Sequence, residues 1–248
     1  MPLKKFKKNI YSQNGEDGII EEIIKRLGLK ENELWCCEFG AWDGIHSSNT
    51  FALVENYNFN AVYIESDKNK FKQLLKTVEK FPKIIPFNLT VDKHSSSQNS
   101  LDNILSKTNI PQNFDLLSID IDSYDLDVWE SLKNYSPKII VIEINSSILP
   151  GILQKHSNET PGNSFSSTLS VANEKDYKLV CHTGNCIFVK KDLVNFLKID
   201  SKFFQYPELL FEKKWLSKKD NLFKKILIKI IPNFLLNYLR SLKRKILS

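Results

Sequence analysis

The sequence predicts an α/β fold in which a parallel sheet is covered on both faces by helices and ends in an antiparallel hairpin. Between residues 34 and 190, short runs rich in β-branched residues alternate with amphipathic helical stretches, an order typical of parallel sheets with helical crossovers. The last two runs, 177–182 and 185–190, are separated by only Thr183 and Gly184. So short a link joins only antiparallel neighbours, and we therefore expect a terminal hairpin.

A helix is expected ahead of the sheet, and five strand-like runs follow it. Five aliphatic residues recur at helical spacing, and Gly28 is suited to end the helix. These residues are Ile19, Ile20, Ile23, Ile24 and Leu27. The strand-like runs cover residues 34–39, 61–65, 83–88, 114–120 and 138–144. Parallel strands align their carboxyl ends at one edge, which is where open α/β sheets bind ligands.

Charge is unevenly distributed along the 248 residues. The chain carries +6 overall, with +4 near its N-terminus and +10 in residues 213–248, so residues 9–212 carry −8. A net-acidic body argues against a broad nucleic-acid surface, which needs cationic phosphate contacts. We expect an N-terminal cap helix in residues 1–30, a cofactor-binding catalytic domain in 31–193 and a basic amphipathic helical extension in 194–248.

The basic extension suits an anionic membrane surface or a partner subunit, including a second copy of the chain. The alternative is that its helices pack on the catalytic domain with solvated lysines. The sequence shows neither a signal-peptide core nor a membrane-spanning run of about 20 apolar residues. A cytoplasmic protein is therefore expected, at the inner face of the membrane if the tail binds lipid. The four cysteines lack metal-ligand spacing and are expected to be buried, reduced thiols.

The residues after the first strand predict a nucleotide-type cofactor site. Glu38, Gly40 and Gly44 follow the pattern acid-x-Gly-x-x-x-Gly, which differs from the Gly-x-Gly-x-x-Gly fingerprint that docks a pyrophosphate. S-adenosylmethionine has no pyrophosphate, and its ammonium group suits an acidic neighbour. Glu65, at the end of the second strand, is placed to accept hydrogen bonds from ribose hydroxyls. The candidates for an adenine contact after the third strand are Asn88, Leu89 and Thr90.

Four oxygen-bearing side chains follow the fourth and fifth strands. Asp120 and Asp122 share one face of an extended chain because their spacing is two, and so do Glu143 and Asn145. Clustered acids are costly unless a cation neutralises them, and carboxylate and amide oxygens suit Mg²⁺ or another hard divalent ion. Such an ion would lower the pKa of an acceptor hydroxyl, and Asp122 or His46 would then take the proton.

Simpler interpretations stay open at this edge. Asp125 would cap the following helix, Asp120 would contact only cofactor or backbone amides, and His46 would be an ordinary loop histidine. Residues 145–164 form a long loop with Pro, Gly and polar residues, which predicts a lid over the acceptor. The alternative for this loop is a disordered connection.

Five stretches resemble the FkbM-like branch of class I S-adenosylmethionine-dependent methyltransferases, in collinear order over about residues 11–193. They are "YSQNGEDGIIEEI", "CEFGAWDGIHSSNT", "LLSIDIDSYDLDVWESL", "VIEIN" and "TGNCIFVKKDL". The resemblance implies a Rossmann-like, seven-stranded sheet with its last strand antiparallel, and methyl transfer to oxygen on a sugar-like or other small hydroxylated acceptor. It implies a cap over cofactor and acceptor made by Gln13, Gly15, Glu16 and Asp17. It also implies a cofactor cleft lined by Glu38, Gly40, Asp43, Asn49 and Glu65.

The run "DIDSYD" is similar to the Asp-x-Asp segment of metal-dependent macrolide-sugar O-methyltransferases. On that comparison Asp120 is a metal ligand and Asp122 is a ligand or base. Those enzymes carry adjacent Asp-Asp or Asp-Asn after strand five, whereas Ile144 separates Glu143 from Asn145 here. This departure counts against the predicted metal ion more than against the predicted cofactor.

We therefore expect a methyltransferase that binds S-adenosylmethionine across the first three strands, with Asp120 at the border of that site, and an acceptor hydroxyl above the fourth and fifth. The expected acceptor is a sugar, a sugar nucleotide or a related phosphorylated intermediate of bacterial surface polysaccharide synthesis. One rival is a nicotinamide-dependent sugar oxidoreductase, which the first loop and the hairpin disfavour. Another is a noncatalytic module on the same fold that binds a partner or a membrane.

Overall fold

The computed structural model describes residues 2–29 and 33–216. The chain divides into a compact unit, Met1–Glu212, and a second unit, Lys213–Ser248, and each is considered by itself. The amphipathic helices expected around Pro232 lie outside the described residues. Residues 194–212, at the start of the expected extension, belong to the first unit.

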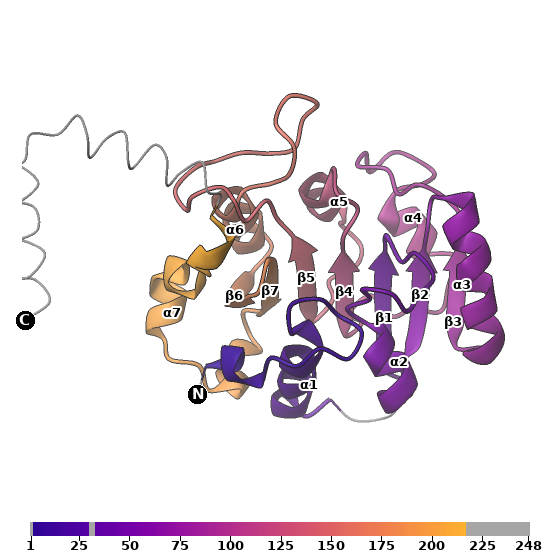
Figure 1. Cartoon of the computed structure of the whole chain (residues 1–248), viewed down its shortest axis with the longest axis horizontal. Coiled ribbons are helices and arrows are strands. Elements are labelled where there is room, and N and C mark those ends of the chain that lie inside the picture. The colour runs from indigo at the N-terminus through magenta and orange to yellow at the C-terminus, as the bar shows by residue number, and fades with distance from the viewer. Residues whose placement is uncertain (1, 30–32, 217–248) are drawn as a thin grey trace, which may run out of the picture. The chain divides into compact units, whose positions relative to one another are not determined.

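Within the described residues, seven strands form one sheet (Figure 1). They are β1 (Trp35–Phe39), β2 (Asn60–Ile64), β3 (Ile84–Phe87), β4 (Leu116–Ile119), β5 (Ile139–Glu143), β6 (Tyr177–His182) and β7 (Asn185–Lys190). The order across the sheet is β3-β2-β1-β4-β5-β7-β6, and β7 runs in the opposite direction to the other six described strands. This is the Rossmann-like class I methyltransferase fold that the sequence predicts, with β4 at the centre and β5 beside it.

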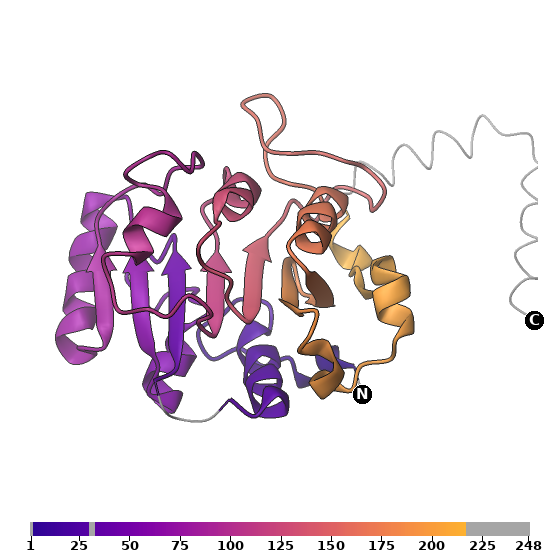
Figure 2. The ribbon, with the colours of Figure 1, turned by 180° about the vertical axis from the view of Figure 1, so that it is seen from behind.

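Helices cover both faces of the sheet, as expected. The α-helices are α1 (Glu16–Leu27), α2 (Phe51–Tyr57), α3 (Lys68–Lys80), α4 (Leu101–Leu105), α5 (Asp125–Ser131), α6 (Phe165–Glu174) and α7 (Lys202–Gln205). Short 3₁₀ turns in the first unit are η1 (Leu3–Phe6), η2 (Val194–Leu197) and η3 (Pro207–Leu210). Figure 1 shows α1 and α2 in front of the sheet, and Figure 2, from behind, shows α4, α5 and α6 over the opposite face. The helices change face between β1 and β4, and such a switch point is where this kind of sheet binds ligands.

Helix α1 forms where the aliphatic spacing predicts it. The four isoleucines of its inner face are buried, and Leu27 is half-buried at the end of the helix. Gly28 adopts φ +63°, and its N–H donates to the carbonyl oxygens of the last turn. A left-handed residue at this point ends a helix, and glycine adopts that conformation at little cost.

The antiparallel hairpin is confirmed, with β6 and β7 joined through Thr183 and Gly184. Strand β7 pairs with the whole length of β5, from Ile139 opposite Val189 to Glu143 opposite Asn185. The register therefore carries the hairpin turn to the same edge as the carboxyl end of β5. The four cysteines are free and buried, as expected. No helix of the described residues is long and apolar enough to cross a membrane.

Candidate functional site

The loop after β1 turns sharply at Gly40, which has φ +81°. A Cβ atom on Gly40 would lie 1.8 Å from the main-chain oxygen of Asp120, so any side chain here would overlap the end of β4. From the sequence, Gly40 is a residue of the predicted cofactor site, where a glycine would let the cofactor approach closely. The structure adds a close approach of the chain's own backbone, which brings the ends of β1 and β4 together.

Glu38 supports this loop from inside the protein. Its carboxylate is buried and accepts hydrogen bonds from the backbone N–H of Asn49 (2.9 Å), from Thr50 Oγ1 (2.7 Å) and from Ser48 Oγ. Burial raises the pKa of Glu38, and these hydrogen bonds act against that rise. The buried Asn49 side chain in turn donates to Ser118 Oγ on β4 (3.1 Å). Glu38 and Asn49 therefore hold the start of α2 against the centre of the sheet.

Glu65 connects the same loop to the end of β2. Its carboxylate accepts from the backbone N–H groups of Trp42 (2.8 Å) and Asp67 (2.7 Å) and is buried. Asn88, after β3, donates from its side chain to the main-chain oxygen of Glu65 (2.8 Å), and the half-buried Leu89 follows it. The predicted cofactor residues at the ends of β1, β2 and β3 thus lie together at one edge of the sheet.

The loop between Gly40 and α2 contains further left-handed residues, Trp42 (φ 51°), Gly44 (φ 79°) and Ser47 (φ 58°). Asp43 accepts from the backbone N–H groups of Ile45 (2.9 Å) and His46 (2.7 Å), which folds the loop back on itself. Left-handed non-glycine residues are sparsely populated and cluster at functional sites.

Trp42 and His46 lie on the outer side of this loop. Trp42 is partly exposed, its ring centroid is 4.9 Å from that of exposed His46, and Lys70 Nζ lies 4.4 Å from the Trp42 centroid. His46, predicted as a candidate base, is thus placed against Trp42. Trp42 is not among the residues predicted from the sequence, although a tryptophan inside a glycine-flanked polar loop is a usable signal of a functional loop.

The N-terminal cap contacts both the loop after β1 and the turn between β6 and β7. Gln13 is exposed, and its side-chain amide donates to Ser47 Oγ in the β1 loop (2.7 Å). The buried Glu16 accepts from Thr183 Oγ1 in the hairpin (2.6 Å). Gly15 precedes α1 with φ +96°, where a Cβ would overlap Lys7.

Asp17, the fourth predicted cap residue, organises the segment before α1. One of its oxygens accepts from the backbone N–H groups of Ile10 (2.7 Å), Tyr11 (2.9 Å) and Ser12 (2.8 Å). Glu16 and Asp17 thus form their hydrogen bonds with other residues of the chain. Of the four predicted cap residues, Gln13 is the exposed one that contacts the β1 loop. Cofactor contacts by the cap stay a prediction.

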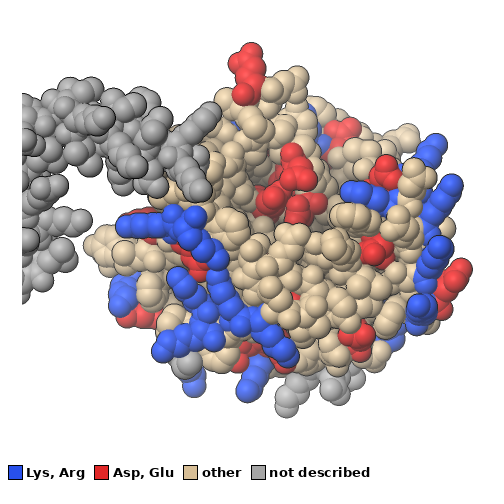
Figure 3. Space-filling model, in the orientation of Figure 1, with Lys and Arg blue, Asp and Glu red and all other residues tan. Residues whose placement is uncertain are grey.

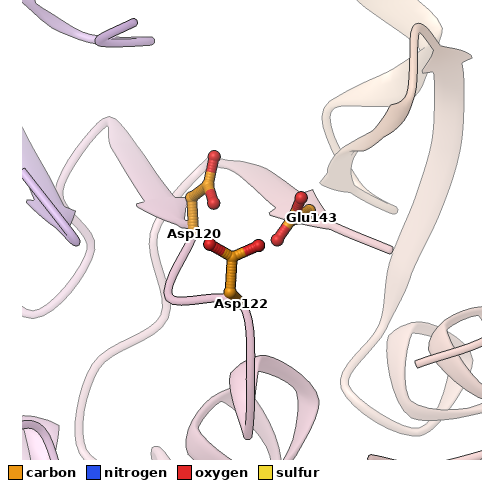
Figure 4. Close-up of side chains that lie close together, drawn as sticks. All are labelled: Asp120, Asp122 and Glu143. Carbon is orange, nitrogen blue, oxygen red and sulfur yellow. The ribbon is translucent and has the colours of Figure 1, made fainter. Parts of the chain in front are cut away.

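Three carboxyl groups converge after β4 and β5, those of Asp120, Asp122 and Glu143 (Figure 4). Each offers an oxygen, and these oxygens lie within 4.8 Å of one another. Figure 3 shows acidic side chains in a hollow of this face. The predicted convergence of these three residues is therefore present in the structure.

The backbone that brings Asp120 and Asp122 together is a turn, whereas their spacing predicted a continuous extended strand. Strand β4 ends at Ile119, and Asp122 adopts the left-handed conformation with φ 57°. The carboxylate of the buried Asp125 accepts from the backbone N–H groups of Ile121 (2.8 Å) and Ser123 (2.9 Å), on either side of Asp122. Asp125 therefore fastens the turn before α5 and holds Asp122 toward the cluster.

Asp120 and Glu143 have raised pKa values and retain protons to a higher pH than isolated acids do. Burial, followed by the neighbouring acids, raises the pKa of Asp120 to about 7 and that of Glu143 to about 9. Asp120 and Glu143 also share a side-chain hydrogen bond. Because both cannot ionise cheaply at this distance, the pair holds a proton near neutral pH.

Asn145, the fourth predicted metal ligand, turns away into the following loop. Its side-chain oxygen accepts from Ser147 Oγ (2.6 Å), and its side-chain nitrogen donates to the main-chain oxygen of Pro161 (3.0 Å). The reason is that β5 ends at Glu143, so the two-residue pleat does not continue to Asn145. Three carboxylates suit a hard divalent cation, and Asn145 serves the loop.

The loop 145–164 is folded on its own hydrogen bonds. The N–H of Asn145 donates to the oxygen of Asn163 (2.8 Å), and the N–H of Ser164 donates to the oxygen of Gln154 (2.9 Å). Figure 1 shows it rising above the carboxyl edge next to α6. It is therefore a folded segment beside the cluster, and a lid role stays a prediction.

Three chain segments meet at Tyr124, two residues after Asp122. Lys93 Nζ lies 3.6 Å from the Tyr124 ring centroid, and the ring of His156, from the loop 145–164, lies 4.7 Å from it. No spacing in the sequence connects these residues, because each belongs to a different loop. They form a cationic and aromatic rim beside the acidic cluster.

No protein-family model and no curated protein matches the chain. It is similar to M. capricolum TrmK in complex with S-adenosyl-homocysteine, with 18% identity, 90% of this chain and 92% of that chain covered, and a TM-score of 0.44. A SAM-dependent methyltransferase from Aquifex aeolicus shows 14% identity, coverages of 75% and 94%, and a TM-score of 0.44. The N-terminal domain of EvdMO1 with SAH bound shows 9% identity, coverages of 72% and 80%, and a TM-score of 0.44. These likenesses are distant, and the fold rests on the chain's own strand order and directions.

Proposed function

We propose that the chain is an S-adenosylmethionine-dependent O-methyltransferase whose active site is the carboxyl edge of the sheet. One observation carries the proposal. At the switch point of a class I methyltransferase sheet, a tightly turned glycine loop after β1 meets three clustered carboxyl groups after β4 and β5. The loop offers a place for the cofactor, and the carboxyl groups offer a place for a hydroxylated acceptor.

The cofactor would lie across the ends of β1, β2 and β3. Glu65 is fixed by two backbone N–H groups, and a carboxylate has further lone pairs for ribose hydroxyls. Gln13 and Asn88 flank this place from the cap and from β3. Glu38, whose contacts are with the start of α2, positions the loop from below. Asp120 lies where the cofactor and acceptor places adjoin.

Methyl transfer needs the acceptor oxygen in line with the sulfonium methyl group and a group that takes the hydroxyl proton. The proton would pass to the carboxylate of Asp122, which is exposed and can release it to water. S-adenosylmethionine, when bound, would supply the methyl group to this oxygen and would leave as S-adenosylhomocysteine, with the electron pair of the broken carbon–sulfur bond on sulfur. His46, whose ring contacts that of Trp42 in the β1 loop, is the alternative base.

A divalent cation fits the donor set of Asp120, Asp122 and Glu143, whose oxygens converge within 4.8 Å. Such an ion, when bound, would lower the pKa of the acceptor hydroxyl. The contribution of the chain itself is to hold the three carboxyl groups together, through the Asp125 hydrogen bonds and the pairing of β4 with β5.

The acceptor we propose is a sugar, a sugar nucleotide or a related phosphorylated intermediate of bacterial surface polysaccharide synthesis. The family resemblance supports the sugar. The rim at Tyr124 supports it chemically, because an aromatic ring can pack on a sugar and the neighbouring Lys93 offers a cation for phosphate.

The test is calorimetric titration of the purified protein with S-adenosylhomocysteine, run beside NAD, each with Mg²⁺ and with EDTA. Micromolar binding of S-adenosylhomocysteine and none of NAD is expected. Binding of NAD alone would favour a nicotinamide-dependent oxidoreductase, and binding of neither would favour a noncatalytic module.

A further inference from the structure

Residues 2–8 and 194–212 form one face of the first unit, which we call the edge face. The turns η1 and η3 and helix α7 all pack on β6, the strand at one end of the sheet. The carboxylate of Glu212 joins the two segments, because it pairs with Lys7 (2.7 Å) and Lys4 (3.3 Å). Figures 1 and 2 agree in showing the N-terminal turn beside residues 194–212.

The edge face is basic. It holds six lysines and three acids, and two of those acids are paired with its own lysines. The lysines are Lys4, Lys5, Lys7, Lys8, Lys198 and Lys202. Figure 3 shows blue side chains gathered on this side of the unit, whereas the acidic hollow lies nearer the middle of the view. An excess of cations on an acidic body favours an anionic partner at this face.

The same face exposes large apolar side chains. Phe196 is 58% exposed, Leu209 is 57% exposed and Tyr206 is 48% exposed. Leu209 also lines a small cavity of about 100 Å³ with Leu3 and Phe203, and Lys4 is part of its wall. Ligand pockets usually measure about 300 Å³ or more, so this cavity is too small for a cofactor. Its apolar lining with a lysine in the wall suits a small apolar group that lies next to an anion.

Lysines among exposed Phe, Tyr and Leu are the composition of surfaces that lie in a membrane interface. The apolar groups enter the boundary of the acyl chains, and the lysines remain among anionic headgroups. The first unit ends on this face at Glu212, and the next residues, 213–248, carry 11 Lys/Arg and a single acid. We propose that the edge face docks the protein on an anionic lipid surface.

This docking does not depend on methyl transfer. The segments that carry it lie beside β6 and α1, whereas the proposed active site is at the carboxyl ends of β1 to β5. Near an anionic surface each lysine contributes about 1 kcal/mol, which corresponds to about a fivefold change in affinity. Loss of two lysines should therefore weaken binding on the order of twentyfold.

The experiment is co-sedimentation of the full chain with phosphatidylcholine vesicles, with and without phosphatidylserine, over a range of salt concentrations. Two variants test the face, Lys4→Ala with Lys5→Ala, and Leu209→Ser. The matched controls are Lys72→Ala with Lys76→Ala, and Leu75→Ser, since these exposed residues lie on α3 beside β3, at the opposite end of the sheet. Retained S-adenosylhomocysteine affinity, or an unchanged circular dichroism spectrum, shows that each variant folds.

We expect salt-sensitive binding to the phosphatidylserine vesicles, weaker binding by both edge-face variants and no change in the α3 controls. Absence of binding to these vesicles would overturn the proposal. Equal binding by the edge-face variants and the wild type would overturn it as well, because the lysines of residues 213–248 would then act alone. If the wild type does not bind the vesicles but has a larger sedimentation coefficient than the edge-face variants, the edge face instead forms a contact between copies of the chain.

Discussion

Gly40→Ala is the substitution whose cost can be worked out most directly from the structure. Any residue but glycine at φ +81° pays about 1–2 kcal/mol for the left-handed conformation. The new Cβ would also lie 1.8 Å from the main-chain oxygen of Asp120, so the end of β1 or β4 must move. Overpacking of this kind costs about 1–3 kcal/mol. The expected loss in the free energy of unfolding is therefore about 2–5 kcal/mol.

Gly28→Ala is the matched control, because Gly28 is also left-handed, with φ +63°, but a Cβ there meets nothing within 4 Å. It should lose only about 1–2 kcal/mol, the conformational cost alone. Urea unfolding followed by circular dichroism measures both, and an unchanged m-value would show that the unfolded states are comparable. Equal losses in the two variants would refute the close approach of β1 to β4. Gly40→Ala should also weaken S-adenosylhomocysteine binding, whereas Gly28→Ala should not.

Three further predictions concern the carboxyl cluster. Asp122→Asn should lower turnover by about 10²–10⁴ with unchanged S-adenosylhomocysteine affinity, and an unchanged rate would remove Asp122 from the mechanism. Because the folded-state pKa of Glu143 is raised to about 9, its contribution to stability is full below the unfolded pKa and is lost as the pH rises toward 9. Without divalent ions, the melting temperature of the wild type should fall as the pH rises from 4.5 to about 9, and Mg²⁺ should offset this fall. Glu143→Gln should make the melting temperature less dependent on pH. Identical pH profiles for the variant and the wild type would contradict the raised pKa of Glu143. Asp125→Ala should cost about 2–3 kcal/mol in thermal unfolding, since two backbone N–H groups lose their acceptor, and a loss below about 0.5 kcal/mol would show that the turn holds without it.

The sequence by itself determined the elements and much of their arrangement. The aliphatic spacing and Gly28 placed α1, and the two-residue link placed the antiparallel hairpin. The polar residues at the strand ends indicated the functional edge, because side chains at the carboxyl ends of parallel strands are carried to the same side of a sheet. These features are local, and local patterns of hydrophobicity and turn residues are enough to specify them.

The tertiary structure alone decided which side chains meet. Asp122 reaches the cluster through a left-handed turn held by Asp125, and Asn145 leaves it because β5 ends at Glu143. Position 40 requires glycine because the main-chain carbonyl group of Asp120, 80 residues away in the sequence, leaves no room for a Cβ atom. Such contacts depend on where each strand stops and on how closely neighbouring backbones pack. No spacing along one segment encodes them, because the partner group comes from a distant part of the chain.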